Sequence, residues 1–467
     1  MMTGKRTLST RELTVIGALI AALLAVSACG GDGDTGANDN PDAAVPGIAC
    51  LDESAVFRAS GTLNTFDSDP QFGNPLDAIA PDFAPMAGSP VLSGGARPPG
   101  GLDGSATFIG AIGADDWTAG WTAYPDGTTV PDQGTVTNIP AGVITTNQRW
   151  TTGDTYILEG PVFFTGGAVL EIQPGVLVRG MPGSALVITN QSVMNAVGTE
   201  AQPIIFTSAS VDAAAAGDWG GVVLLGDARI NAEGGKANIE GFAGADPANT
   251  VFGDNDNDHN CGTLNYLRIE YAGFEISPDI KLSGLTVAAC GNDTELDFIQ
   301  IHRSDNDGIE FLGGKADIAH AVVTQADDDG LDWTLGWTGQ AQFLIVQQSA
   351  SHGRNAIEAD NNELDNEAAP RSAPDIWNAT LIGGNDAAAE QAGMTLRRGT
   401  AGDIGNTIIS HFGRFAIDVA GESSVQQFVD GNLSITSSYF FQNAAGTHWP
   451  ENFDGRGEAQ NDCTMPN

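Results

Sequence analysis

The chain reads Asp307-Gly308-Ile309-Glu310-Phe311, and 22 residues later this pattern returns as Asp329-Gly330-Leu331-Asp332-Trp333. After a further 26 residues it returns as Asn355-Ala356-Ile357-Glu358-Ala359. Each copy follows a short apolar segment, at 298–301, 321–324 and 343–347. A repeat of this length, built from short strands and polar turns, is typical of a solenoid in which each repeat forms one coil.

Stacked coils convert the sequence repeat into a ladder of side chains. Strands of neighbouring coils lie about 4.8 Å apart, so Glu310, Asp332 and Glu358 are predicted to stand side by side on one face. If the aliphatic residue of each copy faces inward, the next residue faces outward, which extends the predicted ladder to Arg397 and Asp418. The polar stretch 361–374 is predicted to be a loop beside this ladder, where binding often occurs.

Short β-branched and aliphatic runs, separated by Gly, Pro and Asn, continue this pattern from residue 145 onward. Three segments, 170–175 (LEIQPG), 198–207 (GTEAQPIIFT) and 217–221 (GDWGG), resemble exported bacterial right-handed parallel β-helix proteins of the pectate-lyase-like architecture. The resemblance covers roughly residues 145–445 and implies an all-β solenoid, which we predict over 145–467. This fold hosts lyases, hydrolases and adhesins, so the resemblance alone does not decide the activity.

The first 28 residues are predicted to be a lipoprotein signal peptide. Lys5, Arg6 and Arg11 precede an apolar run that is too short to span a membrane in the mature protein. The run ends in Val26-Ser27-Ala28-Cys29, which resembles the bacterial lipobox, so cleavage before Cys29 and lipidation of its thiol are expected. An ordinary secretory signal is the alternative. By the same resemblance, the lipid would anchor the protein to the outer membrane or cell surface of a Gram-negative bacterium.

Residues 29–49 are rich in Gly, Asp, Asn and Ala and are predicted to form a flexible tether. Residues 50–144 differ from the repeats and are predicted to form an irregular capping segment. Its motifs at 69–72 and 82–90 resemble the closing segments of β-helix proteins, which favours a permuted arrangement packed on the C-terminal end of the solenoid. A cap over the first coil is the alternative.

Four cysteines remain after Cys29, an even number for an oxidising compartment. Cys261 and Cys290 are 29 residues apart, about one coil, and are predicted to pair between adjacent coils. Cys50 would then pair with Cys463, which fits the permuted arrangement of the capping segment.

The formal net charge is −40, from 59 acidic and 19 basic side chains. A surface of this sign repels nucleic acid, which we exclude as a partner. It attracts cations, and oxygen-rich ligand sets suit Ca²⁺ best. Solubility without any specific ion is an equally good explanation.

Two groups of acidic residues are candidate calcium ligands. Asp305, Asp307, Asp327 and Asp329 lie, with Asp328, in the turns of two adjacent coils. Such turn residues also commonly hydrogen-bond their own backbone, so plain turn chemistry, structural calcium and catalysis all remain open. The second group, Asp254, Asp256 and Asp258, begins like an EF-hand loop. His259 then replaces the required glycine, and an exposed polar loop is the alternative.

A catalytic hypothesis uses the same turns. Polysaccharide hydrolases of this fold carry Asp, Asp-Asp, Gly-His-Gly and Arg-x-Lys on successive coils, and this chain similarly has Asp307, Asp328-Asp329, Ser351-His352-Gly353 and Arg397-Arg398. The resemblance implies Asp307, Asp329, His352 and Arg397 as catalytic residues. Ser351 and the missing lysine depart from the pattern. A calcium-assisted lyase with Arg354 or Arg397 as base is a further version.

The leading functional prediction is a surface-anchored, non-catalytic adhesion or glycan-binding scaffold that calcium stabilises. Glu310, Asp332 and Glu358 would contact the glycan, with Trp337, placed in a turn, as a sugar-stacking side chain. Another envelope protein is an alternative partner. The alternative function is a polysaccharide lyase or glycoside hydrolase acting on an acidic polysaccharide.

Overall fold

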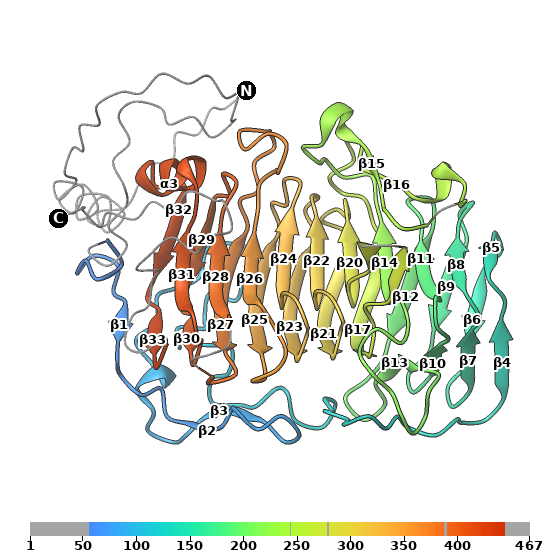
Figure 1. The fold of residues 1–467 in the computed structure, drawn as a ribbon, viewed down its shortest axis with the longest axis horizontal. Coiled ribbons are helices and arrows are strands. Elements are labelled where there is room, and N and C mark those ends of the chain that lie inside the picture. The colour runs from blue at the N-terminus through green and yellow to red at the C-terminus, as the bar shows by residue number, and fades with distance from the viewer. Residues whose placement is uncertain (1–55, 243, 278–279, 387–389, 444–467) are drawn as a thin grey trace.

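The computed structural model describes residues 56–242, 244–277, 280–386 and 390–443, which form a parallel β-helix. In Figure 1 the coils stack in chain order from β4 and β5 at one end to β31 and β33 at the other. Their strands pair in parallel with the strands of neighbouring coils. The predicted all-β solenoid is therefore confirmed.

Two sheets build the coils. Within the described residues, the larger sheet comprises β1 (Thr65–Phe66), β4 (Val136–Ile139), β6 (Gln148–Trp150), β7 (Thr155–Leu158), β9 (Val169–Ile172), β10 (Leu177–Gly180), β12 (Val193–Val197), β13 (Ile204–Ser208), β17 (Gly262–Glu270), β21 (Glu295–His302), β23 (Asp317–Thr324), β25 (Gln340–Gln347), β27 (Asp375–Ile382), β29 (Gly402–Gly405), β30 (Ile408–Ser410), β32 (Leu433–Thr436) and β33 (Tyr439–Phe441).

The second sheet comprises β5 (Gly142–Ile144), β8 (Pro161–Phe164), β11 (Ala185–Ile188), β14 (Val222–Leu225), β20 (Leu285–Ala288), β22 (Ile309–Leu312), β24 (Leu331–Thr334), β26 (Asn355–Ala359), β28 (Ala392–Leu396) and β31 (Phe415–Val419). In the part of the chain that the structure describes, three antiparallel strand pairs lie outside the coils: β2 (Phe72–Asn74) with β3 (Asp82–Pro85), β15 (Ala237–Asn238) with β16 (Val251–Phe252), and β18 (Glu275–Ser277) with β19 (Ile280–Lys281). The helix α3 spans Glu422–Val429, and short 3-10 turns span Pro90–Leu92, Glu233–Gly235 and Pro247–Asn249.

The strand register of the second sheet explains its core. Because side chains alternate between faces, every second residue of each strand points inward, and parallel pairing stacks these residues into columns. One inner column contains Val162, Leu186, Val222, Leu285, Ile309, Leu331, Ile357, Met394 and Ile417. All nine side chains are buried in the main hydrophobic core.

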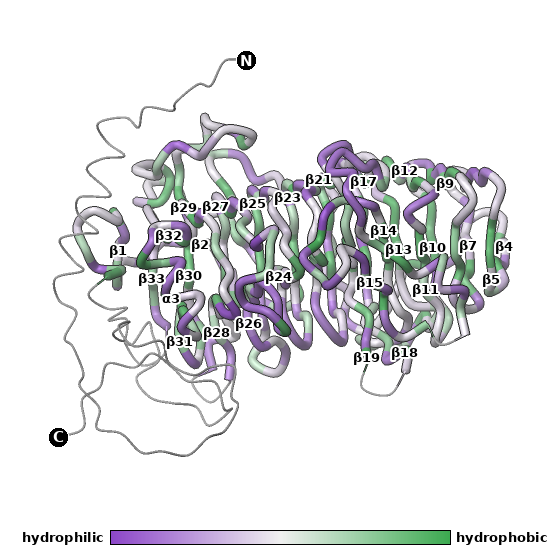
Figure 2. Tube along the Cα trace, turned by 90° about the horizontal axis from the view of Figure 1, so that it is seen from above, coloured by the Kyte–Doolittle hydropathy of each residue, from purple (hydrophilic) through white to green (hydrophobic). Residues whose placement is uncertain are grey.

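The residues between the inward positions form an outer column that changes character along the solenoid. It contains Phe163, Val187, Val223, Thr286, Glu310, Asp332, Glu358, Thr395 and Asp418. The long excursion that includes β15 and β16 covers the apolar half, where Ile230 and Phe252 pack on Val187 and Val223. The trace next to the labels β24 and β26 in Figure 2 is predominantly hydrophilic. This outer column is therefore polar from Thr286 onward.

The segment before the first coil runs along the whole solenoid (Figure 1). It begins beside the last coil, where β1 pairs in parallel with β33 (Thr65 with Tyr439, Phe66 with Phe440). It then passes the middle coils, where Gln347 Nε2 donates to the carbonyl of Pro75 at 2.8 Å and Gln300 Nε2 to the carbonyl of Ala123 at 2.8 Å. It reaches the first coil at β4. We call residues 67–135 the strap.

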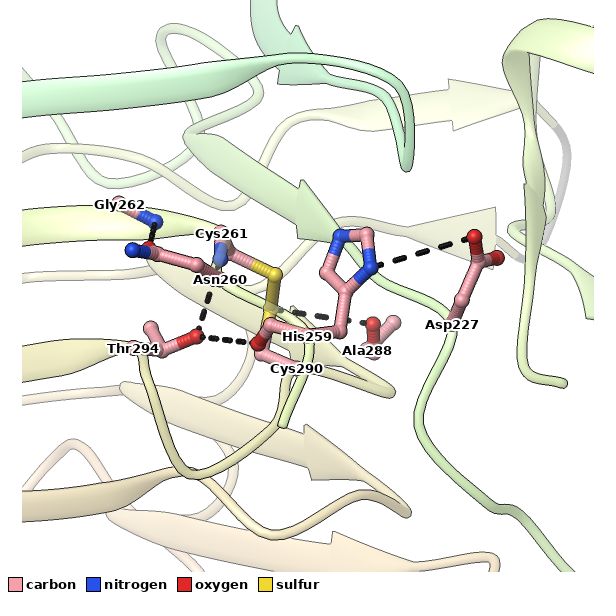
Figure 3. The surroundings of a disulfide bond; sticks show 8 residues. All are labelled: Asp227, His259, Asn260, Cys261, Gly262, Ala288, Cys290 and Thr294. Atoms are coloured by element: carbon pink, nitrogen blue, oxygen red, sulfur yellow. Dashed lines mark hydrogen bonds and ion pairs between the residues drawn. A yellow bond between two sulfur atoms is a disulfide. The ribbon is translucent and has the colours of Figure 1, made fainter. Parts of the chain in front are cut away.

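The predicted pairing of Cys261 with Cys290 is confirmed. Figure 3 shows this disulfide between the start of β17 and the turn after β20. β17 pairs with β21 in the next coil, so the disulfide joins adjacent coils. The hydroxyl of Thr294 accepts a hydrogen bond from the Cys261 amide at 3.0 Å.

The other predicted cysteine roles fall on Cys29, Cys50 and Cys463, which lie outside the described residues, as do the signal peptide and the tether. Among the helices that the structure describes, none combines the length and the hydropathy required to cross a membrane.

Candidate metal centre

Four adjacent strands of the second sheet build a cluster of carboxylates on the outer face. Glu310 on β22 lies beside Asp332 on β24, and Asp332 lies beside Glu358 on β26. Thr286 precedes them on β20 and donates its hydroxyl to Glu310 Oε2 at 3.3 Å. The predicted side-by-side placement of Glu310, Asp332 and Glu358 is therefore confirmed.

A second row of carboxylates stands at the corner where these strands begin. The carboxylate of Asp307 accepts the amide of Asp329 at 3.1 Å, and the carboxylate of Asp329 accepts the amide of Asn355 at 2.7 Å. Each side chain thus caps the backbone of the next coil, as turn carboxylates commonly do. The hydroxyl of Ser283 links the two rows, because it lies 3.2 Å from Asp307 Oδ2 and 3.1 Å from Glu310 Oε2.

Two overlapping groups of carboxylates in this cluster could hold a metal ion. One contains Asp307, Glu310 and Asp332, and the other contains Asp307, Asp328 and Asp329. In each group the ligand oxygens lie within 4.8 Å of one another. Asp307 belongs to both groups, so it is the centre of the cluster.

The electrostatics of the cluster disfavour full ionisation. Burial, followed by the charges of Glu310 and Asp328, raises the pKa of the Asp307 carboxyl well above its usual range. Burial and the charges of Glu358 and Asp307 do the same to the pKa of Asp329. Burial and the charges of Asp307 and Glu358 also raise the pKa of Asp332 well above its usual range. The charged neighbours that raise these three pKa values are all carboxylates. One cation is also close, because Arg354 interacts with the charge of Asp329 and lies 3.7 Å from Asp328.

Asp332 differs from the other members in its hydrogen bonding. Its Oδ1 atom is buried and has no hydrogen-bond partner. A buried carboxylate oxygen without a partner is destabilising unless a proton or a cation satisfies it. The all-oxygen donor set around Asp307 and Asp332 is the kind that Ca²⁺ and Mg²⁺ prefer.

Arginines neutralise the far end of the outer ladder and one side of the corner row, where Arg354 lies 3.7 Å from Asp328 and 3.8 Å from Glu358. Arg397 forms ion pairs with Glu358 and, at 2.8 Å, with Asp360, and Arg398 contacts Asp360 at 2.7 Å. Accordingly, the charge of Arg397 partly offsets the burial that raises the pKa of Glu358. The acidic excess is concentrated at Asp307, Glu310 and Asp332.

The ladder prediction was wrong for Arg397. Glu358 pairs with Thr395, and Thr395 pairs with Asp418, so Thr395 occupies the position that was assigned to Arg397. Arg397 follows the end of β28, and its long side chain reaches back to Glu358. The prediction failed because β28 has two inward-facing aliphatic residues. Leu396, which precedes Arg397, is the second of them, whereas Met394, which precedes Thr395, pairs with Ile357 of the repeat.

The predicted catalytic set is only partly assembled. Asp307 and Asp329 are adjacent, but the His352 ring bonds Asp327 through Nδ1, and Arg397 is held by Glu358 and Asp360. Two of the predicted metal ligands also lie apart from the cluster. Asp305 forms an ion pair with Lys281 at 2.8 Å, and Asp327 pairs with His352. Neither belongs to the carboxylate groups around Asp307.

The loop 254–258 does not form an EF-hand-like ligand set. Asp254 forms an ion pair with Lys236 at 2.8 Å, and Asp258 accepts the side-chain amide of Asn292 at 2.9 Å. The carboxylate of Asp256 caps the amide of Asp258 at 3.3 Å. The carboxylates thus have separate partners, and the described groups that could hold a metal do not include them.

Trp337 was wrongly predicted as an exposed sugar-stacking residue. Its exposed fraction is 0%, its ring stacks on Phe311 with centroids 4.1 Å apart, and its indole N–H donates to the carbonyl of Ala316 at 3.0 Å. Sequence position in a turn therefore did not imply exposure.

Sequence reasoning also missed participants. Ser283 bridges Asp307 and Glu310, and Asp360 holds both arginines at the far end. Asp360 directly follows the third copy of the repeat, which is the signal that could have identified it. Ser283 has no comparable sequence signal, because its contact depends on the stacking of β20 beside β22.

These features define a parallel β-helix with a carboxylate-rich outer face. The chain matches the family model of the pectate-lyase like beta helix domain over residues 142–461 and belongs to that family. Comparison with curated proteins and with solved structures gave no match.

Proposed function

We propose that this protein is a non-catalytic adhesion or glycan-binding scaffold whose outer face is completed by Ca²⁺. The observation that carries the proposal is the shared position of Asp307 in two carboxylate groups, each with its oxygens within 4.8 Å. Arg354 partly compensates the second group through Asp328, so the uncompensated charge is greatest in the group of Asp307, Glu310 and Asp332. Carboxylates at this spacing require either bound protons or a bound cation. In calcium-containing surroundings, a cation is the more effective counter-charge.

The chemistry of the donor set supports Ca²⁺ over a transition metal. Asp307, Glu310 and Asp332 offer carboxylate oxygens, and the Ser283 hydroxyl lies next to two of them. Ca²⁺ takes six to eight oxygen ligands in flexible geometry, whereas zinc and copper favour nitrogen and sulfur. Water or a glycan hydroxyl would supply the remaining ligands.

The neighbourhood of the ladder supports a binding surface. The side chain of Asn231 donates to Asn361 Oδ1 at 2.8 Å and that of Asn362 donates to Asn231 Oδ1 at 3.0 Å, which joins the excursion after β14 to the loop after β26. The amide of Asn231 also donates to the carbonyl of Leu335, directly after β24, at 3.0 Å, and Asn361 follows β26. The joined loops therefore lie at the ends of the strands that carry Asp332 and Glu358. A rigid rim next to a row of acceptors suits polyhydroxylated ligands.

The surface location belongs to the same proposal. The lipobox-like segment before Cys29 and the tether composition support a lipid anchor at the outer membrane or cell surface. The described chain begins beside the last coil, so a tether would join the body at that end.

The test is thermal unfolding of the full chain, purified in detergent, with Ca²⁺ and with EGTA, followed by a glycan screen in both buffers. Saturation at 100 times Kd stabilises the folded state by about 2.7 kcal/mol, so a higher melting temperature in Ca²⁺ is expected. Mg²⁺ at equal concentration is the control. An unchanged melting temperature would show that Ca²⁺ does not stabilise the protein. Glycan binding that EGTA does not affect would show that the ladder binds glycan without Ca²⁺.

The second candidate is a polysaccharide lyase or glycoside hydrolase acting on an acidic polysaccharide. It is favoured by the raised pKa of Asp329 and Asp332, because a carboxyl that keeps its proton can act as a general acid. Incubation with uronic-acid polymers, monitored for new reducing ends and for ultraviolet absorbance of unsaturated products, tests it. Turnover that Asp329→Asn abolishes would replace the non-catalytic proposal.

A further inference from the structure

The first coil of the solenoid is an open edge. Among the described residues, β4 hydrogen-bonds only to β7, β5 only to β8, and β6 only to β9. In Figure 1 these strands form the end of the molecule opposite α3. The strap reaches β4 from the side and leaves the edge of the coil uncovered.

The other end of the solenoid is covered. There β1 adds to β33, α3 packs on β32, and the ring of Phe57 lies against that of Phe428 with centroids 5.4 Å apart. Solenoids generally protect both ends, since an exposed edge invites pairing with another chain. The contrast singles out the first coil as a docking surface.

The open backbone groups can be assigned to residues. The carbonyl of Ile144 accepts the amide of Thr165, and the carbonyl of Ile139 accepts the amide of Glu159. Because peptide groups alternate sides along a strand, the N–H and C=O groups of Val143 and Asn138 point away from the second coil. The side chain of Val143 is also 54% exposed.

The charge of this edge indicates its occupant. Residues 133–148 contain no acidic, basic or histidine side chain, in a chain whose net charge is −40. Edge strands are usually protected by charges, and β4 and β5 have none. The third strand of this edge, β6, carries one charged side chain, Arg149, which pairs with Glu171 of the next coil at 3.5 Å. The uncharged strands β4 and β5 therefore offer no charge that would attract a basic or an acidic partner. Two copies of the chain can approach along these strands without the repulsion that the acidic remainder of their surfaces imposes.

We propose that the first coil is the interface of a symmetric end-to-end dimer of this chain. A two-fold axis perpendicular to the solenoid reverses every strand of the second copy. With the axis through β5, β5 pairs antiparallel with β5 of the second copy, and β4 pairs with β6. Both sheets would then continue across the interface.

The dimer goes beyond the proposed function and does not depend on the cation. It also has a geometric consequence for an anchored chain. Both ends of the described chain lie at the last coil, beside β1 and β33. If the lipid is attached through the N-terminal tether, the first coil points away from the membrane, so the dimer would join chains on two facing surfaces.

The experiment is sedimentation velocity of the full chain in detergent over a concentration series, in EGTA so that calcium does not contribute. We expect wild type to reach twice the mass of one chain. Val143→Lys places two like charges next to the two-fold axis and should raise the dimer dissociation constant at least about tenfold. Val197→Lys is the matched control, because Val197 is 44% exposed on β12, which is paired on both sides.

Val143→Pro is a second variant that separates pairing from charge. Proline is tolerated on an edge strand where the N–H faces solvent, so this variant should fold with the wild-type melting temperature and remain monomeric. A monomeric wild type at all concentrations overturns the proposal and leaves the terminal segments of the chain as the cover of this edge. Dimers of Val143→Lys and Val143→Pro as stable as wild type, or assemblies larger than two, also overturn it.

Discussion

Glu310 on β22 lies in register with Asp332 on β24, so two acidic side chains occupy neighbouring positions of one outer column. The same column is apolar at Val187 and Val223, where the excursion covers it. Like charges opposite each other destabilise a sheet. This arrangement is therefore a local departure from optimal stability, which is common at binding sites.

Asp332→Asn should stabilise the protein in EGTA and remove most of its response to Ca²⁺. The amide removes one of the clustered charges at nearly constant volume, and a gain on the order of 1 kcal/mol is expected. Thermal unfolding of wild type and variant, each with Ca²⁺ and EGTA, provides the measurement. Asp418→Asn, on the same column but beyond Thr395, is the control. Equal calcium responses in wild type and Asp332→Asn would contradict the assignment of Asp332 as a ligand.

The stability without calcium should fall as the pH rises. Burial and neighbouring carboxylates raise the pKa of Asp307, Asp329 and Asp332 in the folded state well above the usual range of an aspartate. Groups of this kind contribute stability that is complete below the unfolded-state pKa and is lost as the pH rises through the folded-state pKa. Melting temperatures in EGTA from pH 5 upward measure this loss, and saturating Ca²⁺ should flatten the curve.

The buried His302 makes stability depend on pH in the opposite direction. The effect of the carboxylates must therefore be measured as a difference between two proteins that share this histidine. Burial lowers the pKa of His302 to about 3, so its contribution to stability is lost as the pH falls below the unfolded-state value near 6.5. The difference between wild type and Asp332→Asn cancels this term, because both chains contain His302. If that difference is independent of pH, Asp332 does not titrate as expected.

Arg179→Met should loosen the strap next to the first coils. The buried Arg179 guanidinium bonds Asp132, the carbonyl of Val130 and, at 2.8 Å, the carbonyl of Ser208. Asp132 is 45% exposed and can be solvated after the substitution, whereas the carbonyls of Val130 and Ser208 lose their donor, at a cost of about 1–3 kcal/mol for each buried group. Limited proteolysis should then cut near residues 129–132 before the coils unfold. Arg149→Met, an exposed pair with Glu171 at 3.5 Å, is the control and should leave the protease pattern unchanged.

Trp337→Ala should destabilise the fold without changing glycan recognition specifically. The ring is buried between Phe311 and Trp333, and removal of a core tryptophan costs about 3–5 kcal/mol. Denaturant unfolding gives the stability, and glycan affinity measured under folding conditions gives the specificity. Unaltered stability together with a loss of glycan binding would restore the sugar-stacking role that the buried position argues against.

The sequence predicted side-chain positions more reliably within strands than at strand ends and turns. Ile309, Leu331 and Ile357 recur at nearly constant spacing, and the side-chain alternation of strands then requires Glu310, Asp332 and Glu358 to lie on the opposite face. The same reasoning failed at Arg397, where two candidate inward positions in one strand could not be distinguished by pattern. It failed at Trp337 because the direction of a turn is set by packing against Phe311.

The sequence by itself determined the coil, the inner columns and the neighbours in the acidic ladder, because these follow from a local period and from the fixed spacing of paired strands. Only the tertiary structure decided which acids share one environment. Asp307 and Asp332 converge across two coils, whereas Asp305 and Asp327 turn to Lys281 and His352. It also decided the course of the strap along the coils. Side-chain direction at corners and contacts between distant segments depend on packing, and the local sequence pattern does not encode them.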